Sequence, residues 1–183
     1  MDTSLARTTA AWIAAILLVF VATLFFYERH VERHEERQGR VFEFAKEYRD
    51  TFTDVRLRFS NNWDLYRSET IDPYNGGELD EGSYATLVER FLEQDTNGAD
   101  FESLASFYGA VGVCVRAELC DFWMARAMFG SDILAFYHNM YPALQAEHDQ
   151  PSRQAIFDFV ARLKSADQHL IAEPNVYHVL DWD

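Results

Sequence analysis

The sequence predicts an all-α protein in which a single N-terminal transmembrane helix continues into a stalk helix, followed by a bundle of about five further helices. One observation is a run of twenty residues, Thr8 to Tyr27, that contains no charged side chain. A second is that apolar residues beyond residue 40 recur at spacings of three and four, the period of a helix with one buried face. Finally, no segment sustains the period-two alternation expected of a half-buried strand.

Residues 1–27 are predicted to be an N-terminal tail and a membrane anchor. A helix of twenty residues covers roughly 30 Å, which matches the hydrocarbon thickness of a bilayer. The run ends in the bulky sequence Leu24-Phe25-Phe26-Tyr27, whereas a cleaved signal peptide ends at small residues. Trp12 and Tyr27 stand near its two ends, and aromatic side chains favour the membrane interface. We therefore expect an uncleaved anchor that crosses the membrane once.

The arginines beside the anchor predict its orientation. Arg7 precedes the apolar run, and four arginines follow it closely: Arg29, Arg33, Arg37 and Arg40. Because basic residues near a span are retained in the cytoplasm, we expect the N-terminus outside a bacterial inner membrane and the C-terminal domain in the cytoplasm. The same four arginines are candidates for contact with anionic lipid headgroups at the membrane surface.

Residues 28–60 are predicted to form a juxtamembrane stalk and the first helix of the bundle, because they contain no proline and only Gly39 as a helix breaker. One stripe of apolar residues, spaced alternately by four and three, is expected to pack against the domain. It consists of Val41, Ala45, Tyr48, Phe52, Val55 and Phe59. Residues 61–82 are predicted to be an irregular acidic connection, since Asp72-Pro73 and Gly76-Gly77 favour turns.

Residues 83–170 are predicted to form the helical domain. The expected boundaries are a helix capped by Ser83, a central helix from Asp100 to Val115, a short helix capped by Asp121 and ending at Gly130, a helix capped by Asp132 and kinked at Pro142, and a last helix that begins at Pro151. In the central helix, Gly109 and Gly112 would let a neighbouring helix approach closely. Cys114 and Cys120 would face different sides of a helix, and we expect buried thiols in a reducing compartment.

Residues 171–183 are predicted to be an apolar tail. Its apolar positions include Val176, Tyr177, Leu180 and Trp182. Such a tail either folds back on the bundle, which we favour, or inserts into a partner. Together with Tyr74 and Glu78 in the acidic connection, these four residues are the predicted partner-docking surface.

Part of the chain resembles a known family. The residues that carry the resemblance are Phe107-Tyr108-Gly109-Ala110-Val111-Gly112-Val113-Cys114-Val115-Arg116-Ala117-Glu118-Leu119, Ala127 to Ile133 and Tyr137 to Pro142. With these residues the chain resembles a family of bacterial single-span membrane proteins of unknown function. The resemblance implies an α-helical cytoplasmic domain on an anchor, and it implies no activity, cofactor or catalytic residue.

Few residues suggest chemistry. His30 and His34 lie one helical turn apart, a spacing that lets two imidazoles bind one metal ion, but solvated histidines at the membrane interface explain them better. Arg116 is expected to be buried and paired with Asp121 or Glu118. The sequence contains no glycine-rich phosphate loop, no nucleophile elbow and no Cys pair at metal-binding spacing. We therefore predict no cofactor, no bound metal and no enzymatic activity.

The charge of the chain bears on its partners. Sixteen Lys and Arg against thirty Asp and Glu give a formal net charge of -14, which repels phosphate backbones and argues against nucleic acid as a partner. An acidic surface fits solubility, a salt-rich habitat or a docking face for a basic partner. We expect the domain to be a protein-interaction module, in an accessory subunit or adaptor of a membrane complex. The alternative is a membrane-bound sensor or effector that responds to metal or pH through His30 and His34.

Overall fold

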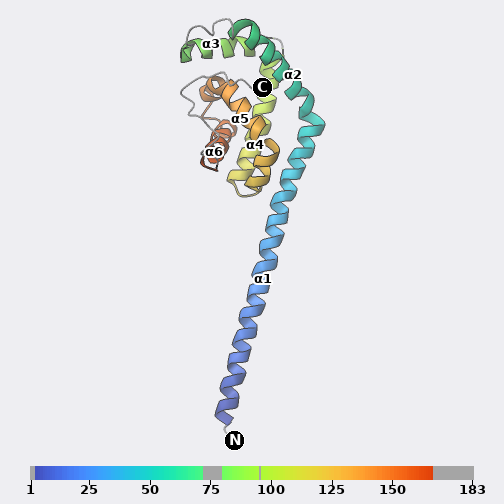
Figure 1. Ribbon diagram of the computed structural model, residues 1–183, viewed down its shortest axis with the longest axis vertical. Helices are drawn as coiled ribbons and strands as arrows, with labels where there is room; N and C mark the ends of the chain where they lie inside the picture. Colours follow the sequence, from blue (N-terminus) through green and yellow to red (C-terminus); the bar gives the residue numbers. More distant parts are fainter. Residues whose placement is uncertain (1–2, 72–79, 95, 167–183) are drawn as a thin grey trace.

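The computed structural model of the chain describes residues 3–71, 80–94 and 96–166, with side chains from residue 17 onward. The elements in this part are all helical, which confirms the all-α prediction. Figure 1 shows one long helix, α1 (Thr3–Glu47), that carries a group of shorter helices at its C-terminal end. The apolar core lies inside that group.

Helix α1 is uninterrupted over 45 residues, a length of roughly 70 Å. Its N-terminal half projects away from the other helices (Figure 1). The large apolar side chains of this projecting part are 48–72% exposed, and they are Leu17, Leu18, Val19, Phe20, Val21, Leu24, Phe25, Phe26 and Tyr27. In the described part of the chain, no helix has the length and apolar character needed to cross a membrane. Residues 8–16 of the predicted span lie outside the side chains that the structure describes.

The chain continues from α1 through a π-helical turn, η1 (Tyr48–Phe52), into α2 (Thr53–Tyr66) and a second π-helical turn, η2 (Arg67–Ile71). The predicted apolar stripe does face the core: its two end residues are buried, and the four between them are partly buried. Helical structure extends to Ile71, beyond the expected boundary at residue 60, because Trp63 and Ile71 fill core positions and are only 3% and 2% exposed. Residues 72–79 of the expected acidic connection lie outside the described residues.

Four further helices complete the described fold: α3 (Glu81–Leu92), α4 (Asn97–Arg116), α5 (Phe122–Ala146) and α6 (Pro151–Ala166). The cap of α3 is Asp80, whose carboxylate accepts a hydrogen bond from the Ser83 N–H at 2.8 Å, so the expectation that Ser83 is the cap is wrong. Asp121 caps α5 as predicted, through the Met124 N–H at 2.9 Å.

Helix α5 is longer than predicted. It runs through Gly130 without a break, so the expectation of two helices, the second capped by Asp132, is wrong. Gly130 is buried against the Leu163 side chain of α6, and the packing of this face holds the helix together across the glycine. The predicted kink is confirmed: Met140, two residues before Pro142, has non-helical backbone angles of φ -111° and ψ 17°.

The closest helix pair is α4 and α6, and two glycines permit it. A Cβ atom built on Gly109 would lie 2.7 Å from the Ser152 Cβ and 2.8 Å from the Ser152 carbonyl oxygen. A Cβ on Gly112 would collide with the Ala155 carbonyl. The two backbones are therefore in direct contact, which confirms the role predicted for the glycines. Helix α4 also touches α2, α3 and α5, so this contact lies at the centre of the domain.

This packing generates a stability prediction with a matched control. Replacing Gly112 by Ala forces the α4 and α6 backbones apart, and we expect the free energy of unfolding to fall by about 2 kcal/mol or more. Replacing Gly39 by Ala, in the exposed part of α1 where nothing lies within 4 Å, should leave stability unchanged or raise it by up to about 1 kcal/mol. Urea denaturation of both variants measures the difference, and equal stabilities would contradict the close-packed interface.

Candidate functional site

The interior of the domain holds a polar cluster between α4, α5 and the η1 turn. The Tyr48 hydroxyl donates a hydrogen bond to Asp132 Oδ2 at 2.7 Å and lies 3.0 Å from the Tyr108 hydroxyl. Arg56 Nη1 donates to the other oxygen of Asp132 at 3.1 Å. Sequence reasoning assigned Asp132 to a helix cap, because nothing in the sequence shows that Tyr48 and Arg56 lie beside it.

The physical role of this cluster is to join helices. The Tyr48 ring stacks on Phe107 at 5.2 Å and meets Phe129 edge-on at 5.6 Å, so apolar side chains surround the hydroxyl groups. Burial raises the pKa of Tyr48, and the neighbouring Tyr108 and Asp132 raise it further. Burial likewise raises the pKa of Tyr108. Both tyrosines therefore stay protonated at physiological pH and serve as hydrogen-bonding groups.

Three further ion pairs tie helices together. Arg58 of α2 holds Asp100 of α4 through two hydrogen bonds of 2.7 and 2.6 Å, and Asp100 is 5% exposed. Arg153 of α6 is 1% exposed and donates to Glu102 at 2.6 Å and to Glu147 at 3.0 Å. The two buried charges, on Asp100 and Arg153, each have an oppositely charged partner, which offsets the cost of burying charge.

The turn after α4 is held by a disulfide between Cys114 and Cys120, both of them buried. The expectation of two thiols on different sides of a helix is wrong, because α4 ends at Arg116 instead of continuing through residue 120. Glu118 adopts a left-handed conformation with φ 57°, which turns the chain back. The N–H groups of Leu119 and Cys120 then donate to the Cys114 carbonyl at 2.9 and 3.1 Å.

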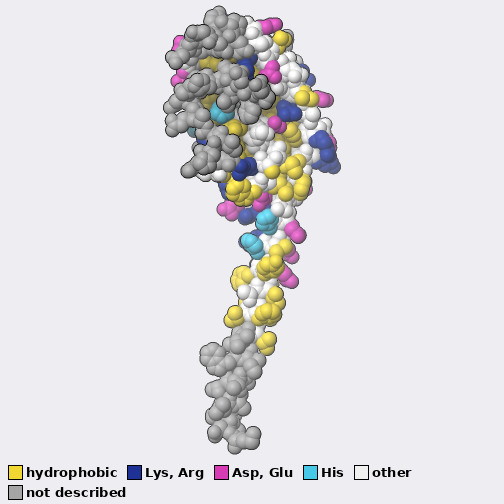
Figure 2. Space-filling model, in the orientation of Figure 1, with side chains coloured by type: hydrophobic (Ala, Val, Ile, Leu, Met, Phe, Trp, Pro, Cys, Tyr) yellow, Lys and Arg dark blue, Asp and Glu magenta, His cyan; other side chains and the backbone are white. Residues whose placement is uncertain are grey.

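This turn forms the end of the domain that faces the projecting part of α1, which we call the basal surface. It consists of Arg37, Glu118, Leu119, Trp123, Arg126 and Arg162. The turn rests on α1 directly: the Asp121 N–H donates to the Arg37 carbonyl at 3.3 Å, and the Arg37 side chain meets Glu118 at 3.2 Å. Figure 2 shows hydrophobic and charged side chains gathered where the domain meets the stalk.

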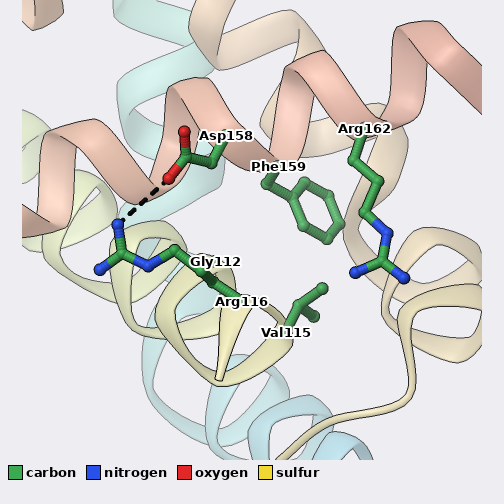
Figure 3. A pocket seen from close by; sticks show the side chains of 6 residues that line it. All are labelled: Gly112, Val115, Arg116, Asp158, Phe159 and Arg162. Atoms are coloured by element: carbon green, nitrogen blue, oxygen red, sulfur yellow. Dashed lines mark hydrogen bonds and ion pairs between the residues drawn. The ribbon is translucent and has the colours of Figure 1, made fainter. Parts of the chain in front are cut away.

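Two small cavities of about 190 Å³ each open beside the basal surface. The first is shown in Figure 3, where Val115 and Phe159 form an apolar wall between the Arg116–Asp158 pair on one side and Arg162 on the other. The second is lined in part by Arg37, Trp123 and Arg162. Arg162 borders both cavities, and its guanidinium lies over the Phe122 ring at 4.4 Å. Both cavities are smaller than the 300 to 1,000 Å³ typical of ligand pockets.

The expected environment of Arg116 is corrected by this geometry. Its partner is Asp158 of α6 at 3.1 Å, rather than Asp121 or Glu118, and its side chain is 43% exposed rather than buried. Asp121 is occupied by capping α5, and Glu118 by Arg37. The sequence carries no signal that would have selected Asp158, which is 42 residues away.

The residues predicted to lie at the membrane surface are all part of α1. Arg29 stands over the Phe25 ring at 5.8 Å, Arg33 and Arg40 are exposed, and Tyr27 is 68% exposed. Of the six, Trp12 lies outside the described side chains. The predicted docking residues also lie outside the described residues: Tyr74, Glu78, Val176, Tyr177, Leu180 and Trp182.

The two histidines of the stalk lie in different surroundings. His34 Nε2 is 3.7 Å from Asp121 Oδ2, so the second histidine reaches the domain, whereas His30 is exposed on the stalk. Among the described residues no group of three or more His, Cys, Asp or Glu side chains is arranged to hold a metal ion. The interpretation of these two residues as solvated histidines that hold no metal stays a prediction.

The tyrosine cluster generates the second prediction. Replacing Tyr48 by Phe keeps the stacked ring but removes the hydroxyl that donates to Asp132, and we expect the free energy of unfolding to fall by about 1 to 3 kcal/mol. Replacing Tyr141 by Phe is the control, because its ring contacts Tyr137 and Phe157 while its hydroxyl makes no hydrogen bond within the described residues, and the change should stay within about 0.5 kcal/mol. Thermal or urea unfolding compares them; a neutral Tyr48 variant would show that the hydroxyl does not stabilise the fold.

Comparisons with protein-family models, curated proteins and solved structures give no match to this chain. The resemblance to a family of single-span bacterial proteins therefore stays a prediction, and the function is argued from the residues and their geometry.

Proposed function

We propose that this chain is a single-pass membrane protein whose helical domain acts as a protein-interaction module, as an accessory subunit or adaptor of a membrane complex. The observation that carries the membrane part is the exposed apolar surface of α1 from Leu17 to Tyr27, which makes no packing contact with the core. Nine large apolar side chains in water on one projecting helix would be strongly unfavourable. Joined to the uncharged residues before it, this surface makes a run of twenty residues, which is long enough to span a bilayer.

The domain part of the proposal rests on where the polar groups are used. The buried Asp100 carboxylate and the buried Arg153 guanidinium each pair with an oppositely charged side chain of another helix, and the two cavities are small. The exterior carries the charge: residues 41–183 account for the whole of the -14, because the five acids and five arginines in residues 1–40 cancel. Such a surface suits recognition of a basic partner by complementary charge.

The proposed location is the bacterial inner membrane with the domain in the cytoplasm. Arg29, Arg33, Arg37 and Arg40 all lie within thirteen residues of Tyr27, close enough to count in the positive-inside rule. One observation favours the opposite orientation. The disulfide between Cys114 and Cys120 is a bond that persists mainly in oxidising compartments, such as the periplasm.

An experiment on native membranes separates the two orientations. In spheroplasts, we expect the domain to resist added protease and to be digested only after the membrane is opened, because the arginines hold it inside. In a second measurement, cells are quenched with acid so that thiols and disulfides cannot exchange. The denatured protein is then treated with a thiol-reactive polymer, with and without prior reduction, to show whether the two cysteines are free thiols. Labelling without reduction would show that Cys114 and Cys120 are thiols in the cell. Digestion in closed spheroplasts together with labelling only after reduction would overturn the cytoplasmic orientation and leave the anchor intact.

The competing function is a membrane-bound sensor or effector that uses His30 and His34. The observation that favours it is the 3.7 Å distance between His34 Nε2 and Asp121 Oδ2, which places one of the two histidines beside the residue that caps α5. Replacing both histidines by glutamine separates the two functions. Retention of the partner and absence of metal uptake by the wild type would remove the sensor function, whereas lost response with the partner retained would favour it.

The interaction proposal predicts a stoichiometric partner. The protein, extracted from its native membrane in a mild detergent at native salt, should co-purify with one or more membrane proteins. Truncation after Ala172 removes the tail residues predicted to dock, namely Val176, Tyr177, Leu180 and Trp182, and we expect the partner to be lost while the helical content is kept. The matched control truncates the chain after Trp182, which removes only Asp183, spares all four residues and should retain the partner. A protein that purifies alone after low-salt and high-salt washes would contradict the proposed subunit role.

A further inference from the structure

The turn at the basal surface and the start of α5 expose two large apolar side chains that are four residues apart in the sequence. Leu119 is 46% exposed and Trp123 is 61% exposed, although the buried core lies directly behind them in Cys120 and Phe122. The turn is fixed by the disulfide, by the Asp121 cap of α5 and by the two hydrogen bonds to the Cys114 carbonyl. Leu119 and Trp123 therefore belong to a rigid element. Within the described residues, no other side chain covers either of them fully.

Basic side chains lie near Trp123. The Arg126 guanidinium lies 5.4 Å from the centre of the Trp123 ring, and Arg162 borders the same cavity as Trp123. The basal surface and the cavity beside it carry Arg37, Arg116, Arg126 and Arg162 against Glu118, Asp121 and Asp158. Three of these arginines are at least partly exposed beside apolar groups: Arg116 beside the apolar wall of the first cavity, Arg126 beside the Trp123 ring and Arg162 beside the Phe122 ring. They are so placed in a domain that is acidic as a whole. Tryptophan and arginine together are the residues that favour the boundary between lipid headgroups and acyl chains.

The position of the turn along α1 places it near the proposed bilayer. It touches α1 at His34 and Arg37, and Tyr27 at the end of the apolar run is seven residues before His34. Seven residues of helix measure about 10 Å, and the headgroup region of one leaflet is about 5 to 8 Å thick. Transmembrane helices tilt by about 20° on average, which lowers one side of an attached domain towards the membrane. The exposed side chains of Leu119 and Trp123 belong to this basal end of the domain.

We propose that the basal surface docks on the lipid headgroup layer of the membrane that α1 enters, with Leu119 and Trp123 inserted among the headgroups and Arg126 and Arg162 beside lipid phosphates. This inference rests on the proposed anchor. We assign the basal surface to the bilayer rather than to a protein, because the continuous helix fixes it within about 10 Å of the apolar run. At that distance from a membrane-spanning segment, the surface faces the lipid headgroups. Docking would hold the domain in one orientation relative to the membrane.

The test uses the full-length protein in nanodiscs whose phospholipids carry bromine near the headgroup end of their acyl chains, because bromine quenches nearby tryptophans. Single replacements by Phe isolate three of the four tryptophans. The emission spectrum of each variant is subtracted from that of the wild type. The difference for Trp123→Phe gives the emission of Trp123, and the difference for Trp12→Phe gives that of the anchor. The difference for Trp63→Phe gives the emission of the buried core, where Trp63 is 3% exposed. Nanodiscs of phosphatidylcholine alone are compared with nanodiscs that also contain phosphatidylglycerol.

We expect brominated lipid to remove most of the Trp123 and Trp12 emission and little of the Trp63 emission, with stronger quenching of Trp123 when phosphatidylglycerol is present. Quenching of Trp12 without quenching of Trp123 in either lipid would overturn docking and leave the anchor standing. Failure of Trp12 to quench would overturn the anchor itself. Protection of Trp123 from a water-soluble quencher only when a protein partner is bound would also overturn the proposal, since the occupant would then be protein. Unchanged circular dichroism of each variant shows that it folds.

Discussion

The structure depends on one rigid connection: α1 runs without a break from its exposed apolar half into the core of the domain. The buried part of the helix begins at Val41, which is 1% exposed. Directly after α1, Tyr48 fixes the helix to the domain, because its hydroxyl donates a hydrogen bond to Asp132 of α5 and lies against the Tyr108 hydroxyl of α4. A flexible linker would let the domain move freely relative to whatever holds the apolar half. A continuous helix instead transmits position and rotation from one end to the other, so the orientation of the domain is set by the helix that bears it.

Around this helix, the domain uses close backbone contact and paired charges to reach a compact core. Gly109 and Gly112 bring α4 against α6, while Arg58 and Arg153 each hold α4 through a carboxylate. These interactions are directional, in contrast to the apolar core, which is rich in phenylalanine and tyrosine rings in mutual contact. The combination fixes one arrangement of helices that apolar burial alone would leave less sharply defined.

Periodicity in the sequence was enough to predict that the domain is helical, because α2 through α6 each carry a buried face, but it did not show that α5 runs through Gly130 as one helix. The glycine contact, the kink before Pro142 and the Asp121 cap were also predictable, since each follows from the backbone chemistry of one residue type. The partners of Arg116 and Asp132 were not predictable, because they lie 42 residues away on α6 and 84 residues away at Tyr48. The disulfide was missed for a related reason: it requires the helix to end at Arg116 and Glu118 to reverse the chain, and nothing in the spacing of the cysteines shows where that end falls.

The exposed stretch of α1 between Tyr27 and His34 acts as a spacer of defined length and phase. Each residue added to or removed from a helix changes its length by 1.5 Å and its rotation by about 100°. A change of one residue between Glu28 and Arg33 would therefore turn the basal surface away from its present direction, even though every contact within the domain would survive. Only a change of about seven residues, close to two full turns, would restore the direction while shifting the domain by about 10 Å. The length of this exposed stretch is thus under a geometric constraint that its own side chains, which face solvent, do not reveal.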